Sequence, residues 1–161
     1  MARSVETWLD NLCKVWSTVS DGENGTVRSF LVFERNELPN SFITAIEGAC
    51  AASYVESLQP EYSAGGPTLF FWNGVTEFHL TADVKPANAG MVMLYFSRIV
   101  AAAAGSMKLS NTVEHFFIPS TENAVQMVTF NHPVTGQPDH QGILVRWQVK
   151  QNVSGDYTVS A

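Results

Sequence analysis

Histidines and their carboxylate neighbours are the residues of this sequence with the chemistry to serve a reaction or to hold a metal ion. They are Glu77, His79, Glu114, His115, His132, Asp139 and His140. His132 and His140 lie eight positions apart in a proline-containing stretch, whereas paired histidines on a helix lie four apart and zinc modules use short fixed spacings. We therefore expect exposed loop histidines here and no metal site, with His132, Asp139 and His140 as the set to examine.

Glu77 and His79 are two positions apart in an apolar run, so they would share one face of a strand. Such a pair could exchange protons with a substrate if that face lined a cavity. Strand alternation alone also explains the pair, as the polar outer face of a half-buried sheet. We favour the polar outer face.

The two cysteines, Cys13 and Cys50, form no Cys-x-x-Cys pair. Cys13 sits in an amphipathic helical pattern with no histidine near it in sequence, which is typical of a core thiol and not of a nucleophile. Gly-x-Ser-x-Gly, Walker A and Gly-x-Gly-x-x-Gly sequences do not occur. We therefore expect no enzyme, no catalytic residue and no cofactor.

The composition indicates a folded chain with little surface charge. Hydrophobic residues make up 45% of it and charged residues 15%, so we expect partners to cover much of the surface. The net charge is −6, without a cluster of Lys or Arg. Clamping a nucleic acid needs a basic patch, whereas an acidic surface suits a passage through which DNA slides without sticking.

The element that organises the chain is a strand over residues 142–151, Gly-Ile-Leu-Val-Arg-Trp-Gln-Val-Lys-Gln. Apolar Ile143, Val145, Trp147 and Val149 alternate with other residues, which is the period of a half-buried strand. A second signal lies at 68–81, where two apolar runs flank Asn-Gly at 73–74. That pattern predicts a hairpin with a two-residue type I′ turn at Asn-Gly.

Two helices are predicted. The first runs from Ser4 as N-cap to about Thr18, and the long apolar one runs from about Asn88 to Gly105 as a left-handed C-terminal cap. The apolar stretch 91–104 contains Ser97 and Arg98 and is shorter than a membrane span, so we expect no membrane contact. Acidic residues near the N-terminus interrupt the apolar core that a signal peptide needs.

The remaining pattern predicts strands over 26–34, 49–59, 112–118 and 124–130, and a short helical turn over 41–47. Pro60 is expected to end the second of these strands. Together the elements predict an α+β fold, a mainly antiparallel sheet with the N-terminal helix and the long apolar helix packed on one face. Residues 1–151 form one domain in this interpretation, and 152–161 form a tail ordered by a partner.

Aromatic residues exceed what one small core needs, at 11% of the chain. The run Phe70, Phe71 and Trp72 could stack on bases or sugars, but such runs more often serve core and subunit interface. We predict an interface made by Tyr62, Phe70, Phe71, Trp72 and Tyr95. A charged residue at Trp72 or Phe71 should then leave a folded monomer that cannot assemble.

In the order and size of these elements, the chain resembles the tail-terminator (tail-completion) proteins of long-tailed bacteriophages. The segments that carry the resemblance are 62–67 (Tyr-Ser-Ala-Gly-Gly-Pro), 74–81 (Gly-Val-Thr-Glu-Phe-His-Leu-Thr) and 142–151. The resemblance implies a homo-oligomer, usually a hexameric ring, that caps the tail tube and meets the head connector. Tail-tube protein, head–tail connector protein and passing DNA would be its partners, without catalysis. It would be assembled in the host cytoplasm and reside in the neck of the virion.

Two other classes of function stay open from the sequence. A tail-tube or head–tail connector protein would continue its sheet between subunits. A small-molecule enzyme or binding domain would need a pocket between the long helix and the sheet, lined by polar groups such as Glu77, His79 or His115.

Overall fold

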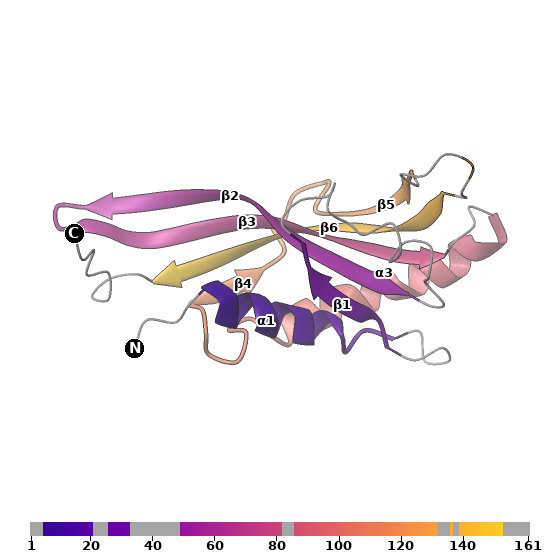
Figure 1. Ribbon diagram of the computed structural model, residues 1–161, viewed down its shortest axis with the longest axis horizontal. Helices are drawn as coiled ribbons and strands as arrows, with labels where there is room; N and C mark the ends of the chain where they lie inside the picture. Colours follow the sequence, from indigo (N-terminus) through magenta and orange to yellow (C-terminus); the bar gives the residue numbers. More distant parts are fainter. Residues whose placement is uncertain are drawn as a thin grey trace.

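The computed structural model describes residues 5–20, 26–32, 49–81, 86–131, 136 and 139–152. Its elements follow the chain as α1 (Val5–Trp16), β1 (Arg28–Leu31), β2 (Cys50–Ser63), β3 (Gly66–Thr81), the 3-10 turn η2 (Pro86–Asn88), α3 (Ala89–Ala104), β4 (His115–Phe117), β5 (Val125–Phe130) and β6 (His140–Asn152). The described part is a mixed α/β fold with two α-helices and a curled mixed sheet (Figure 1). The predicted turn over 41–47, His132 and residues 153–161 lie outside the described residues.

All six strands belong to one sheet. The order is β1-β2-β3-β6-β4, and β5 also pairs with β6. Among the strands that the structure describes, only β1 and β2 run parallel, and every other pair is antiparallel. The expected mainly antiparallel sheet is therefore present, and its two longest strands, β2 and β3, run together beyond the others (Figure 1).

The alternation predicted for β6 is confirmed. Ile143, Val145, Trp147 and Val149 are all buried in the main hydrophobic core. Both helices contribute to this same core, α1 through its tryptophans and α3 through a stripe at helical spacing: Trp8, Leu12, Trp16, Val92, Tyr95, Ile99 and Ala103. An amphipathic helix buries one such stripe, and the residues between these positions are free to carry polar or exposed side chains.

Aromatic rings join α1 to the sheet. Trp16 meets Phe78 edge-on with ring centroids 5.3 Å apart, and Trp8 meets Trp147 in the same way at 5.9 Å. Since side chains alternate along a strand, the Phe78 contact assigns the two faces of β3. Glu77 and His79, its direct neighbours, point to the face away from α1.

The predicted hairpin at Asn73-Gly74 is wrong. β3 continues through both residues, and the chain reverses at 64–65, where Ser63 pairs with Gly66. Gly74 is needed for another reason, because a Cβ there would overlap the Trp147 ring, which lies over this backbone. Glycine at this position allows the Trp147 ring to lie close to the backbone of β3, and it does not form a turn.

Pro60 does not end β2, which continues to Ser63. Among the described residues, β2 beyond Ser53 pairs with β3 alone, since β1 reaches only residues 50–53. An edge strand tolerates proline because the missing N–H is not needed on the open side.

The long helix ends as predicted, but not by the predicted geometry. Gly105 has φ −75°, an ordinary right-handed value, and its N–H donates to Ala101 O at 2.9 Å. Positive φ occurs instead at Leu109, Ser110 and Asn111, where the chain turns toward β4. Pro86–Ala104 is 19 residues of helix, long and apolar enough by length and composition to cross a membrane. Only 22% of that window is buried, and the buried part is the stripe from Val92 to Ala103 in the core.

Candidate functional site

A buried polar cluster forms where β3 and β6 run side by side. Glu77, His79 and His140 are 1%, 4% and 5% exposed. His79 Nε2 lies 3.8 Å from Glu77 Oε1, and His79 Nδ1 lies 3.3 Å from His140 Nδ1. One of the two Nδ1 atoms must carry the proton and the other accept it, so the pair can share a proton.

The expected exposed positions of these residues are therefore wrong. Glu77 and His79 do not form a polar outer face, and His140 is not an exposed loop histidine. β6 begins at His140, which places that ring beside His79, and Phe130 of β5 stacks on His79 with ring centroids 4.2 Å apart. Neighbouring strands bury this face of β3, which alternation along β3 alone could not reveal.

The cluster also contains a cysteine that the sequence did not connect to it. Cys50 of β2 is directly opposite His79 in register. Burial raises the pKa of the Cys50 thiol to about 12, which outweighs the lowering effect of Arg28. A thiol with this pKa stays protonated at neutral pH and is no nucleophile.

The cluster does not amount to a metal site. Within the part of the chain that the structure describes, no three His, Cys, Asp or Glu side chains lie so as to hold a metal ion. Asp139 is exposed, while Glu114 and His115 lie apart near β4, where His115 packs against Phe117 at 5.1 Å. Cys13 is half-buried on α1 and lies outside the buried core, and burial raises the pKa of its thiol.

The pocket postulated between the long helix and the sheet would need Glu77 and His79 on the helix side. They point to the opposite face from Phe78, whose ring contacts α1. The described geometry therefore places these two polar groups on the face of β3 away from α1.

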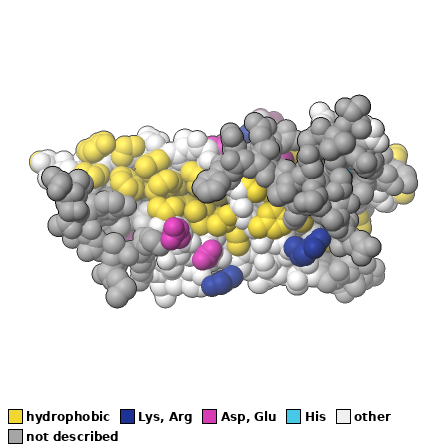
Figure 2. All heavy atoms as spheres, viewed as in Figure 1, with side chains coloured by type: hydrophobic (Ala, Val, Ile, Leu, Met, Phe, Trp, Pro, Cys, Tyr) yellow, Lys and Arg dark blue, Asp and Glu magenta, His cyan; other side chains and the backbone are white. Residues whose placement is uncertain are grey.

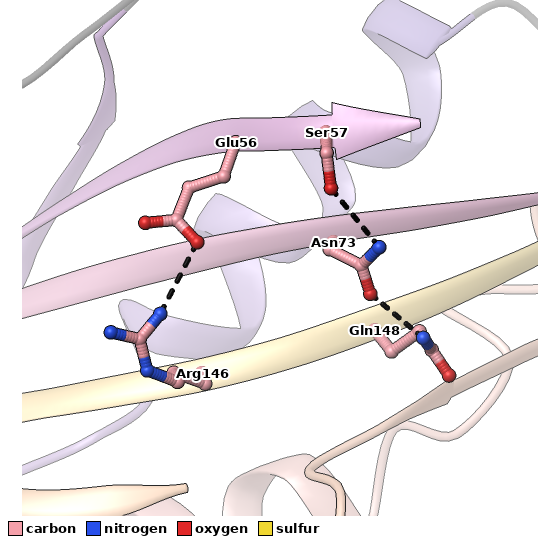
Figure 3. A network of polar contacts seen from close by, with 5 residues as sticks. All are labelled: Glu56, Ser57, Asn73, Arg146 and Gln148. Carbon is pink, nitrogen blue, oxygen red and sulfur yellow. Dashed lines mark hydrogen bonds and ion pairs between the residues drawn. The ribbon is translucent and has the colours of Figure 1, made fainter. Parts of the chain in front are cut away.

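Farther along the same outer face, a polar network crosses three strands (Figure 3). Asn73 donates to Ser57 Oγ at 3.2 Å and accepts from Gln148 at 2.7 Å, and Arg146 meets Glu56 at 3.2 Å. The ion pair is half exposed, so it contributes about 0–1 kcal/mol. Asn73, expected in a turn, instead joins β2 to β6 across β3.

Residues 56–63 of β2 and 66–73 of β3 form an arm, in which β6 pairs with β3 as far as Leu69 and the tip beyond is two-stranded (Figure 1). Every residue of its β2 half is exposed, including Leu58 at 40% and Tyr62 at 72%. The arm carries Glu56 and Glu61 and no basic residue. It thus offers apolar side chains and an open strand edge at the same place.

The predicted interface residues divide between arm and core. Tyr62 is exposed, and Phe70 and Phe71 are half-buried on the arm. Trp72 packs on Trp8 with centroids 5.9 Å apart. The Trp72 Nε1–H also donates to Gln151 at 2.9 Å, so this side chain anchors the arm to the core. Tyr95 is only 3% exposed in the core, so it is not available to a partner in this fold.

A groove lies at the base of the arm, between α1, β1 and β2. Its volume is about 470 Å³, and its apolar lining includes Leu9, Leu31, Val32 and Val55. Two acidic residues of α1, Glu6 and Asp10, also line it. Figure 2 shows hydrophobic side chains gathered in a band across this face, with both acidic and basic side chains beside the band.

A second exposed apolar surface lies on α3. Met93, Leu94 and Val100 are 63%, 51% and 46% exposed. They are on the side of the helix away from the buried stripe and belong to a segment, 86–113, that contains no Asp or Glu.

Comparison with protein-family models and with curated proteins finds no match to this chain.

Proposed function

We propose that this protein is a structural assembly protein that closes into a ring, of the kind formed by phage tail terminators. The observation that carries the proposal is the presence of two separate exposed apolar surfaces on one small fold. The arm exposes Leu58 and Tyr62, and α3 exposes Met93 and Leu94. Single exposed apolar residues are ordinary, but contiguous ones mark sites of interaction.

Two different apolar surfaces suit a cyclic assembly. A ring with one protomer type uses heterologous contacts, in which one patch meets a different patch of the next copy. A two-fold dimer would need only one self-complementary patch. In this assembly α1 and α3 pack side by side on one face of the sheet. The hydrophobic core that both helices share with β3 and β6 supports this arrangement.

The charge balance supports a virion role with DNA passing by. The chain has net charge −6 and 15% charged residues, and the charged residues of the arm are Glu56 and Glu61. Such a surface repels phosphates and does not hold them. In this proposal the ring caps the tail tube, meets the head–tail connector and performs no reaction.

A tail-tube or connector protein is the second candidate, favoured by the open edge of β2. In the described residues, positions 55–63 have a strand neighbour on the β3 side only. Such an edge can pair with a strand of another subunit. Stacked tubes of this protein would support this candidate, and closed single rings would support the terminator.

Light scattering and negative-stain imaging of the purified chain test the proposal. Rings of about six copies are expected, and Tyr62→Glu should reduce the mass of the particle, since a charge is added to an exposed apolar site. Gln59→Glu adds the same charge to an exposed polar site of the same strand and is the matched control. A monomer at every concentration, alone and with tail tubes, would contradict the proposal.

A further inference from the structure

We infer that the groove between α1, β1 and β2 receives the outer face of α3 from a second copy of this chain. The inference rests on the proposed self-assembly and assigns α3 to the groove of the next copy, so the exposed side chains of the arm make a separate contact. An amphipathic helix lying in an apolar groove is a common mode of protein recognition.

Shape supports this pairing. The groove of about 470 Å³ is lined by one helix and two strands, and most of its lining is apolar. The exposed side chains of α3 recur at the spacing of one helix face, with Met93 and Leu94 followed by Ser97, Val100 and Ala101. Met93 and Leu94 are long enough to enter a groove, while Ser97 and Ala101 allow close approach of the backbone.

Charge decides between α3 and the arm as the occupant. Glu6 and Asp10 of the groove are acidic. The arm contributes Glu56 and Glu61, so it would bring like charges together. α3 contributes Arg98, whose guanidinium also donates to Ser20 O of its own copy, and no acidic residue. The groove and the outer face of α3 are therefore the two surfaces with complementary charge. These charges mainly determine the orientation in which the two copies meet and add little to the affinity.

The position of the two surfaces permits a chain of contacts. α1 and β1 lie in the foreground of the molecule and α3 passes behind them (Figure 1). Because the groove and the outer face of α3 are different surfaces, each copy can bind α3 of one neighbour in its groove and place its own α3 in the groove of another. This is the head-to-tail contact from which rings are built.

A charge placed on α3 gives a direct test. Leu94→Glu changes a side chain that is 51% exposed, so the protomer should stay folded by circular dichroism. The added carboxylate would face Glu6 and Asp10. We expect this repulsion to raise the apparent Kd of self-association at least tenfold. Met127→Glu is the matched control, since Met127 is an exposed apolar residue of β5 at 39%.

A compensating change makes the test specific. Asp10→Lys in the Leu94→Glu background should restore the particle mass, because the ammonium would meet the new carboxylate. Arg98 is less suited to such a swap, since its guanidinium donates to Ser20 O within its own copy. Leu31→Cys with Leu94→Cys, in a Cys13→Ser background, should give a ladder of cross-linked multimers on oxidation, and either single cysteine should give dimers at most.

The outcomes separate this inference from the proposed function. Rings that persist in Leu94→Glu but dissociate in Tyr62→Glu would overturn the α3 contact and leave the ring intact as a proposal. A wild-type monomer would overturn both. Saturable binding of a small apolar dye to the groove of the assembled particle would show an open groove, and would overturn the inference alone.

Discussion

Replacing Gly74 with alanine tests the assignment of this residue to a strand interior under a tryptophan. In the structure, a Cβ at this position would overlap the ring of Trp147. That indole is 1% exposed, meets Trp8 edge-on and donates its Nε1–H to Thr76 Oγ1 at 3.0 Å. The ring is held from two sides and has little room to move away.

The expected effect follows from two opposing terms. Alanine restricts the unfolded chain more than glycine and would stabilise an unobstructed strand by about 0.4–1 kcal/mol. Overpacking a rigid core costs about 1–3 kcal/mol. Since the overlap is with a ring inside the core, we expect the second term to be larger, and Gly74→Ala to lower the free energy of unfolding by about 1–2 kcal/mol. For a chain of this size that corresponds to a fall in Tm of about 2–4 °C per kcal/mol.

Urea unfolding, followed by circular dichroism, measures this change as a shift of the midpoint at constant slope. Trp147→Phe is the background for a double-mutant cycle, because it removes the part of the indole that the new Cβ would meet. In that background Gly74→Ala should be neutral or stabilising. A stabilising effect of Gly74→Ala in the wild-type chain, or an equal cost in both backgrounds, would refute the steric explanation.

Three further predictions concern the thiol, the arm and the polar network. Because burial raises the pKa of Cys50 to about 12, the folded state keeps its proton where the unfolded state loses it. Stability should therefore be intact below about pH 9 and fall toward pH 12, by up to ~1.4 kcal/mol per unit, and Cys50→Ala should remove this part of the slope in urea midpoints. Trp72→Glu should cost about 2–4 kcal/mol of stability because it removes the anchor on the core, whereas Phe71→Glu should leave the Tm nearly unchanged; equal melting temperatures would contradict this division of the arm. Asn73→Ala should lower the free energy of unfolding by about 1–2 kcal/mol, because two cross-strand hydrogen bonds are lost. If hydrogen exchange of the wild-type chain instead showed no β2–β3 pairing at Asn73, this residue would lie in a turn.

Local pattern was sufficient for the elements with one periodic face. The alternation around Trp147 identified β6, and the 3.6-residue period identified α1, because the side of a strand or helix that meets the core is encoded in its own residues. α3 was expected from its apolar run, but it is apolar nearly all round, so its residues alone did not show which side is buried. The charge deficit and the surplus of aromatic residues are likewise properties of the sequence. They are what the proposed assembly first rests on.

Partners distant in sequence decided the rest. Asn73-Gly74 carries the local signature of a turn, but the position of Trp147 over Gly74 and of Gln148 beside Asn73 makes it a strand interior. Glu77 and His79 alternate like a polar outer face, and only the pairing of β3 with β6 and the stacking of Phe130 bury them. The groove needs three separate elements, α1, β1 and β2. Each of these features depends on contacts whose free energy exceeds the local preference of a few residues, so only the tertiary structure could determine them.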